Sequence, residues 1–293
     1  MFDSFNLHFL TLGKSKRTAQ EYIKEARYFA AFIRESHAVE MTDEELLVLA
    51  TKADAYEYIS SCTKKDLSKA TIARKVSSLR SFYNFLIEFD FVSANPFQSI
   101  HRPKITRKLP VYLSLQDARV LIQSVRGKKD LFYRRRDGCI VIWFLNLGLR
   151  LSELAGLTLA DVYDDSVRIL GKGDKERYVP LNKSCQRALR LWLAHRGRDQ
   201  GGLFVSKSGV TISDSSIGAL IKKGIRDAGL NPALSTHKLR HTCATLLYRY
   251  GQVDLRLLQE ILGHASVATT EIYTHVVDEQ LIKAMESHPL ADF

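Results

Sequence analysis

The chain has 293 residues and is 45% hydrophobic, so it can bury a substantial core and we expect two domains. Lys and Arg outnumber Asp and Glu by 43 to 32, a formal net charge of +11, which favours a polyanionic partner, with a basic but inert surface as the alternative. The four cysteines form no CxxC pair and no apolar run could span a bilayer. We therefore expect a soluble, cytoplasmic protein without a zinc ribbon or disulfide framework.

The first hundred residues predict an all-helical domain, residues 1–100. Ser15 or Thr18 begins one helix and Ser68 or Thr71 a second, and apolar residues at helical spacing follow each start. Asn-Pro at 95–96 then ends the helical region.

Cationic side chains cover the outer faces of the second helix and continue into residues 101–112, which have no apolar periodicity and predict a basic linker. A solvated helix face is the simpler interpretation, and contact with the phosphates of a nucleic acid is the functional one. The candidate phosphate contacts are Lys69, Arg74, Lys75, Arg80, Lys104, Arg107 and Lys108.

Residues 113–293 predict a second domain of mainly helical, α+β type. We expect one antiparallel hairpin within it, with strands over 167–170 and 177–181. The expected helices begin at Ser114, at Ser152, at Ser213 or Asp214, and after Asp254, and extend over 138–147, 237–250 and 277–286.

Five side chains of this domain suit phosphoryl transfer: Arg150, His237, Arg240, His264 and Tyr273. Arginine forks bind phosphate oxygens, histidines donate hydrogen bonds or move protons, and a phenol can act as a covalent nucleophile. His237 and Arg240 are three residues apart on one predicted helix and should face the same way. The phenol has an ordinary pKa near 10, so its attack requires nearby cations.

Each of these residues also has a structural explanation. A single histidine or arginine is more often a satisfied hydrogen-bonding group, and a single tyrosine a half-buried core residue. His237 and His241 are spaced like zinc ligands, but the glutamate of a zinc protease motif is absent. Lys172, in a glycine-rich turn between the two strands, could be a mobile proton donor or only part of the turn.

Together these motifs resemble the tyrosine recombinases, and in particular the compact Xer-type members. The resemblance rests on Gly-Leu-Arg150-Leu-Ser-Glu-Leu, Gly-Lys172-Gly-Asp-Lys-Glu-Arg, His237-Lys-Leu-Arg240-His, Leu-Gly-His264 and the following Tyr273. It implies a SAM-like, core-binding N-terminal domain that clamps DNA, and a catalytic domain over 113–293. It also implies six catalytic residues: Arg150, Lys172, His237, Arg240, His264 and the nucleophile Tyr273.

The resemblance further implies that Tyr273 forms a 3′-phosphotyrosine and that strands exchange through a Holliday junction, without metal, ATP or other cofactor. Double-stranded DNA and a cyclic tetramer, of this chain alone or with a paralogous recombinase, are the implied partners. It also implies that the last helix docks in a neighbouring protomer, although packing on its own domain is the alternative. An Xer-like role in chromosome or plasmid resolution is expected; integrases or transposon recombinases, a non-catalytic DNA-binding regulator and a metal-dependent nuclease remain as rivals.

Overall fold

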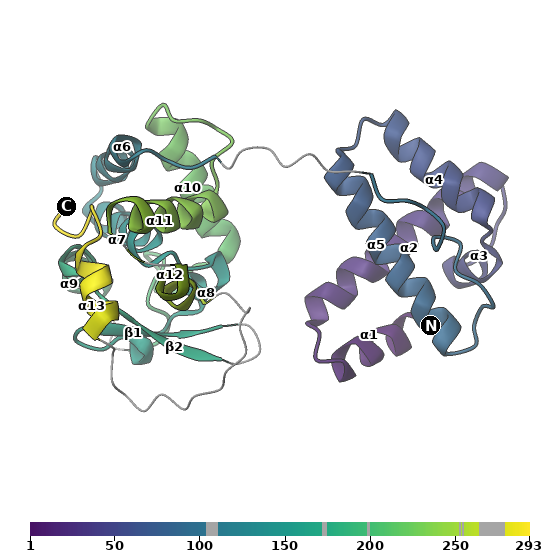
Figure 1. The fold of residues 1–293 in the computed structure, drawn as a ribbon, viewed down its shortest axis with the longest axis horizontal. Coiled ribbons are helices and arrows are strands. Elements are labelled where there is room, and N and C mark those ends of the chain that lie inside the picture. Colours follow the sequence, from purple (N-terminus) through teal and green to yellow (C-terminus); the bar gives the residue numbers. More distant parts are fainter. Residues whose placement is uncertain (104–110, 172–174, 198–199, 252, 254, 264–278) are drawn as a thin grey trace. The chain divides into compact units, whose positions relative to one another are not determined.

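The structure is a computed structural model of the chain. It describes residues 1–103, 111–171, 175–197, 200–251, 253, 255–263 and 279–293, and the statements below concern these residues (Figure 1). The chain divides into two compact units, Met1–Lys108 and Leu109–Phe293, and each has its own hydrophobic core.

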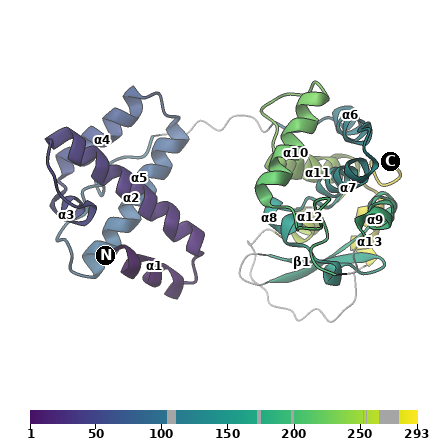
Figure 2. The same cartoon turned by 180° about the vertical axis from the view of Figure 1, so that it is seen from behind.

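The described part of the first unit is helical, as predicted. Its helices are α1 (Phe2–Thr11), α2 (Lys16–His37), α3 (Asp43–Leu49), α4 (Lys52–Lys64) and α5 (Lys69–Glu88). Helix α2 packs against the other four, and α4 also packs against α5 (Figure 2). Aromatic side chains fill the space between them; those fully buried are Phe5, Phe9, Phe29, Phe82, Tyr83, Phe85 and Phe97.

The starts of α2 and α5 follow from their capping residues. The side chain of Ser15 accepts a hydrogen bond from the Thr18 backbone N–H, and the side chain of Ser68 accepts one from Thr71. Each serine thus satisfies a backbone donor that the first helical turn leaves unpaired. Of the two candidate starts for each helix, the first is the one that the structure adopts.

The second unit is mainly helical, with a single hairpin among its described residues. Its elements are α6 (Leu115–Arg126), α7 (Leu131–Leu147), α8 (Leu151–Gly156), the 3₁₀ turn η1 (Leu159–Asp161), β1 (Ser166–Leu170), β2 (Glu176–Pro180), α9 (Lys183–Arg196), α10 (Asp214–Asp227), α11 (Thr236–Tyr250), α12 (Leu255–Leu262) and α13 (Glu279–Glu286). The predicted fold class, all-α followed by α+β, is confirmed.

Helix α7 is the centre of this unit. Every residue from Arg136 to Leu147 is buried, because α6, α9 and α11 all pack against this helix. A helix that is apolar on all sides requires such cover, as the sequence indicated. This packing holds the C-terminal end of α7 in place, and with it the start of the segment that follows.

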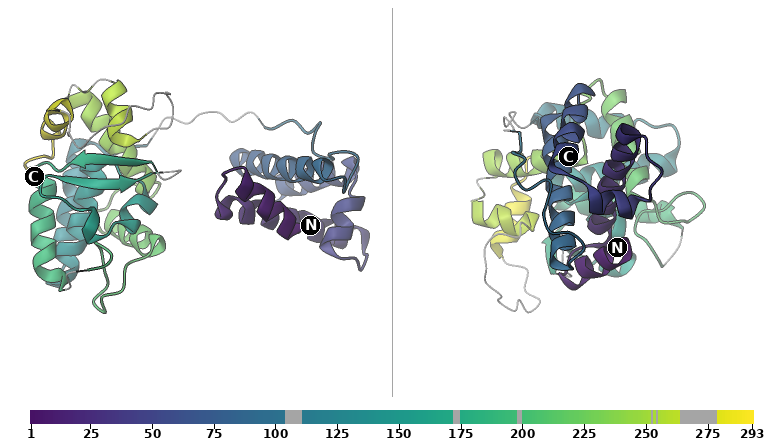
Figure 3. Two further views of the ribbon diagram at one scale, coloured as in Figure 1. Left: turned by 90° about the horizontal axis from the view of Figure 1, so that it is seen from below. Right: turned by 90° about the vertical axis from the view of Figure 1, so that its right-hand side faces the viewer.

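The hairpin lies at one edge of the unit, where Figure 3 shows both strands side by side. Strands β1 and β2 are antiparallel, with Ser166 opposite Pro180 and Leu170 opposite Glu176. The N–H of Gly171 donates to the carbonyl of Lys175 at 2.7 Å, which closes the base of the turn. The predicted hairpin is present, shifted by one residue at three of its four strand ends.

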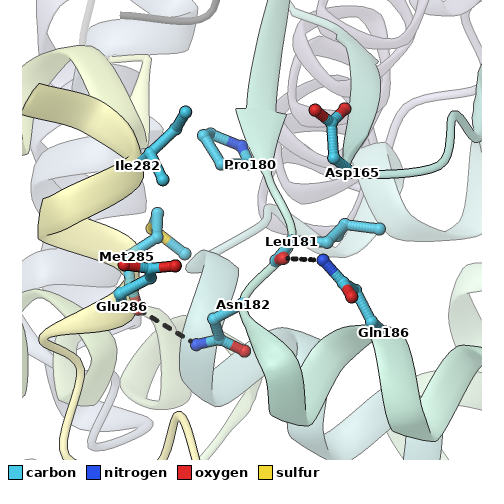
Figure 4. A pocket seen from close by; sticks show the side chains of 8 residues that line it. All are labelled: Asp165, Pro180, Leu181, Asn182, Gln186, Ile282, Met285 and Glu286. Carbon is cyan, nitrogen blue, oxygen red and sulfur yellow. Dashed lines mark hydrogen bonds between the residues drawn. The ribbon is translucent and has the colours of Figure 1, made fainter. Parts of the chain in front are cut away.

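The last helix packs on its own domain. Met285 and Leu290 are fully buried in the core of the unit, and the amide of Asn182 donates to the carbonyl of Met285 at 3.2 Å. A cavity of about 160 Å³ remains between α13 and the end of β2, lined in part by Asp165, Ile282 and Glu286 (Figure 4). Of the predicted apolar stripe, Met285 thus lies in the chain's own core, Ile282 is exposed and Val277 lies outside the described residues. Docking of this tail in a neighbouring protomer stays a prediction.

Candidate active site

Arg150 is positioned by the end of the central helix. Gly148 terminates α7 in the left-handed conformation (φ +60°), and a Cβ at this residue would lie 2.5 Å from the side chain of Leu262. Glycine therefore meets both a backbone and a packing requirement here. Arg150 follows as the N-cap residue of α8, and its side chain is 34% exposed.

The Arg150 guanidinium is held from two sides. Its Nη1 donates to Oε1 of Glu153 at 2.6 Å, and its Nη2 donates to the backbone carbonyl of Gly263 at 2.9 Å. The carboxylate of Glu153 also accepts from the Arg150 backbone N–H at 2.8 Å. Side chain and backbone of Arg150 are thus fixed by one carboxylate, while part of the cation remains accessible.

Arg240, on α11, lies deeper, with a relative exposure of 7%. Its guanidinium donates to the carbonyls of Gly148 and Leu262, and the nearest carboxylate oxygen in the described part of the chain, on Glu153, is 3.9 Å away. Burial and the like charge of Arg150 lower the pKa of Arg240 to about 10. The side chain is therefore still cationic at neutral pH, and among the described residues its one ion pair, with Glu153, is long.

The two arginines converge although 90 positions separate them in the sequence. Arg240 binds the carbonyl of Leu262, and Arg150 binds the carbonyl of the next residue, Gly263. Two guanidinium groups on adjacent carbonyls form a cationic site that suits the oxygens of one phosphate.

Glu153 and Arg177 belong to this site and were not predicted from the sequence. Arg177, on β2, binds both oxygens of Glu153, at 3.1 and 2.9 Å. Burial acts to raise the pKa of Glu153, but the hydrogen bonds and charge of Arg177, together with bonds from Arg150, outweigh it and lower the pKa to about 2. Glu153 lies in the motif around Arg150 and Arg177 in the motif around Lys172, and this position within the motifs is the sequence signal that could have identified them.

His237 lies in the first turn of α11 and is exposed, whereas Arg240 is buried. The two residues share a helix as predicted, but their side chains differ in depth. His241 is also exposed; burial, then the charges of Lys238 and His237, lowers its pKa. Within the described ranges, no group of three His, Cys, Asp or Glu side chains is arranged to hold a metal ion.

Three predicted catalytic residues, Lys172, His264 and Tyr273, lie outside the described residues. The described chain reaches Gly171 before the first of them and Gly263 before the second. Gly263 adopts a left-handed conformation (φ +64°) directly beside Arg177.

The predicted phosphate contacts of α5 have different surroundings. Lys69 and Arg74 are exposed on its first two turns. Lys75 is buried: its ammonium donates to Glu25 at 2.6 Å and to the hydroxyl of Tyr58 at 3.2 Å.

Arg80 is directed inward within the same unit, because its guanidinium donates to the carbonyls of Phe97 and Ile100. Lys75 and Arg80 thus have structural partners, and only Lys69 and Arg74 remain as exposed candidates among the described contacts. Lys104, Arg107 and Lys108 lie outside the described residues.

Two family models match the chain. The model described as "Phage integrase family" matches residues 116–280, and the model described as "Phage integrase, N-terminal SAM-like domain" matches residues 6–88. In the part of the chain that the structure describes, no helix is both long and apolar enough to cross a membrane.

Similar proteins extend over most of the chain. It is 41% identical over 256 residues to a tyrosine recombinase XerC of Caldanaerobacter subterraneus subsp. tengcongensis, a match covering 85% of this chain and 71% of the relative. It is 36% identical to a tyrosine recombinase XerC of Thermodesulfovibrio yellowstonii, covering 96% and 93%. The solved structure of a XerH site-specific recombinase bound to a palindromic difH substrate is similar with a TM-score of 0.62 and 25% identity, covering 74% of this chain and 67% of that one.

Proposed function

The chain belongs to the phage integrase family, and from this premise we propose that it is an Xer-type tyrosine recombinase that cuts and rejoins DNA at specific sites. The resemblance inferred from the motifs is confirmed, as is a SAM-like domain in the N-terminal half. The relatives named XerC favour an Xer-like role over integration or transposition.

In the proposed reaction the phenol oxygen of Tyr273 attacks a scissile phosphate. A 3′-phosphotyrosine forms, and the 5′-oxygen of the broken strand leaves as a hydroxyl. Arg150 and Arg240 bind the non-bridging oxygens, where negative charge develops in the transition state. The ester retains the energy of the broken bond, so a partner strand's 5′-hydroxyl can reverse the step and produce a Holliday junction.

The remaining proposed roles concern protons. Lys172 protonates the leaving 5′-oxygen, His237 acts in acid–base steps, and His264 donates a hydrogen bond to the phosphate. The exposed position of His237 on the first turn of α11 is compatible with proton exchange with solvent. These assignments come from the family motifs.

The observation that carries the proposal is the convergence of Arg150 and Arg240 on consecutive carbonyls. A buried guanidinium whose ion pair with Glu153 is as long as 3.9 Å, beside a second guanidinium, is costly unless an anion is bound during function. A regulator that had lost catalysis would not need this pair together with the intact tyrosine motif.

Double-stranded DNA is the proposed substrate, and a cyclic tetramer on two DNA sites, of this chain alone or with a paralogue, is the proposed assembly. Lys69 and Arg74 are the phosphate contacts proposed for the first unit, with Lys104, Arg107 and Lys108 in the linker. Such contacts supply affinity and position and do not by themselves select a sequence.

A nicked suicide substrate tests the proposal. The wild type should become covalently attached to a DNA 3′ end, equally in EDTA and in magnesium, because no step requires a metal. Tyr273→Phe should bind DNA with unchanged affinity and form no adduct. Attachment through another tyrosine, or an adduct that needs a divalent ion, would contradict the mechanism.

A further inference from the structure

Arg177 connects three parts of the catalytic unit. From β2, its Nη1 and Nη2 reach the two oxygens of Glu153 in α8, and its Nε donates to the carbonyl of Ile261 in α12 at 3.3 Å. The side chain is 15% exposed. One planar guanidinium thus joins the hairpin, the start of α8 and the end of α12.

The Arg177 side chain also explains why a glycine precedes His264. A Cβ on Gly263 would lie 2.9 Å from Nη1 of Arg177 and 3.0 Å from its Cζ. No other residue type fits this position while Arg177 stays in place. The carbonyl of Gly263 is also the acceptor for Arg150, so Arg177 packs directly on the backbone that holds that arginine.

Glu153 is saturated only when Arg177 is present. A carboxylate offers about four acceptor positions. Arg150 supplies two donors, its backbone N–H and Nη1, and Arg177 supplies the other two. If Arg177 were removed, two buried acceptor positions would be vacant. The guanidinium of Arg150, which already donates to this carboxylate through Nη1, could then turn to fill them.

Charge leads to the same conclusion. Three guanidinium groups, those of Arg150, Arg177 and Arg240, surround the single carboxylate of Glu153, and three minus one leaves +2. Without Arg177 the cluster carries +1, and Glu153 has only Arg150 as a close ion-pair partner. The positive potential available to a phosphate would fall, because Glu153 would be neutralised by Arg150 alone.

We propose that Arg177 is a positioning residue for Arg150: it saturates Glu153 so that the Arg150 guanidinium stays directed at the scissile phosphate. It does not touch the reacting atoms. This inference rests on the proposed function and adds a residue to which neither the motifs nor the family comparison assigned a role.

The test compares Arg177→Met with Arg168→Met in single-turnover cleavage of the suicide substrate. Arg168 is a matched control, because it lies on the neighbouring strand and pairs with Asp161 and Glu176, away from Arg150. Arg177→Met should cleave about 10²-fold more slowly, the size of effect expected when a catalytic group is misplaced by about 1 Å. Arg168→Met should cleave like the wild type.

Arg177→Lys keeps the positive charge but loses the bidentate guanidinium, so its cleavage rate should lie between those of Arg177→Met and the wild type.

Two substrate analogues separate positioning of Arg150 from other roles. A bridging 5′-phosphorothiolate has a leaving group that needs no proton, so it should rescue Lys172→Ala but not Arg177→Met. A methylphosphonate at the scissile position lacks the charge that Arg150 neutralises, so the ratio of wild-type to Arg177→Met rates should shrink towards one. A general loss of structure would leave that ratio unchanged.

The inference is overturned if Arg177→Met cleaves as fast as Arg168→Met, if the phosphorothiolate restores its rate, or if its defect is as large on the methylphosphonate as on the ordinary phosphate. If Arg177→Met does not fold, the same comparisons on Arg177→Lys decide the matter, with thermal unfolding as the check on folding. Failure of the proposed function is distinguishable, because the wild type itself would then form no adduct.

Discussion

Glu153 links the site to the stability of the fold. Its pKa is about 2 in the folded chain, against an ordinary value of 4.5. For a carboxyl group with a lowered pKa, the stabilisation is fully present above pH 4.5 and is lost as the pH falls towards 2. The difference of about 2.5 units corresponds to ~3 kcal/mol in the free energy of unfolding.

We therefore expect Glu153→Gln to be less stable than the wild type at pH 7, and the gap to close between pH 4.5 and pH 2. Urea unfolding of both proteins at a series of pH values measures it. Glu176→Gln is the control, since Glu176 is exposed and its ion pair with Arg168, at 3.3 Å, lies on the surface. A gap that stays constant from pH 7 to pH 3 would show that the charge of Glu153 does not stabilise the fold.

Sequence motifs identified Arg150 and Arg240 but not the residues that hold them. Arg177 and Glu153 are 24 positions apart, and no periodicity or spacing rule connects a strand residue to the first turn of a preceding helix. The difference in burial between His237 and Arg240 was likewise not predictable. Helical spacing places two residues on the same face of a helix, but it does not say which other elements pack over each of them.

Within α5, two neighbouring cations should behave differently. Arg74 is 62% exposed and lies 3.6 Å from Glu25, whereas Lys75 is buried and donates to Glu25 at 2.6 Å and to the hydroxyl of Tyr58. Arg74→Ala should weaken DNA binding and reduce the slope of log affinity against log salt by about one, as for one lost phosphate contact. It should lower stability by at most about 1 kcal/mol, because its 3.6 Å ion pair with Glu25 is largely solvent-exposed on the arginine side.

Lys75→Met should instead destabilise the first unit by about 3–5 kcal/mol, because Glu25 would remain buried without its closest partner. Salt-dependent binding and thermal unfolding of both variants make the comparison. An unchanged salt slope for Arg74→Ala, or an unchanged melting temperature for Lys75→Met, would contradict this division of roles.

The packing of α13 makes a second prediction at this scale. Met285 is fully buried, and Ile282, one turn earlier, is 37% exposed. Met285→Ala should destabilise the monomer by about 2–5 kcal/mol, and Ile282→Ala much less. In a domain of this size each kcal/mol lowers the melting temperature by about 2–4 °C.

The measurement is thermal unfolding at several protein concentrations. A tail packed on its own domain gives a loss that does not change with concentration, whereas a tail donated to a neighbour gives one that grows as the protein becomes more dilute. The second result would support the donation of the tail to a neighbouring protomer that the sequence suggested.

Elements were most predictable where a capping residue precedes a periodic apolar run, as at Ser68 before α5. Helix α9 was not singled out, although Asn182 caps it and Trp192 anchors it in the core. The preceding strand ends only two residues earlier, so strand and helix signals overlap there. The docking of α13 could not be predicted, since an apolar stripe fits the chain's own core and a neighbour's equally well.

At the scale of the whole molecule, the question is whether four copies of this chain complete the reaction. Each of the two units has its own core, and each carries residues proposed to contact DNA. A cyclic assembly of identical chains contains one type of head-to-tail contact, so every protomer can take the active position in turn.

We expect the purified chain alone, on DNA carrying two copies of its mapped site, to exchange both pairs of strands and yield recombinant products. A time course that resolves Holliday junctions from products measures this, with Tyr273→Phe mixed in as the control. If every protomer takes a turn, a minority of Tyr273→Phe subunits should make junctions accumulate, because the second exchange then meets an inactive subunit. Junctions that accumulate with the wild type alone would instead show that this chain does not complete the second exchange by itself, and adding a paralogous recombinase would then be the next test.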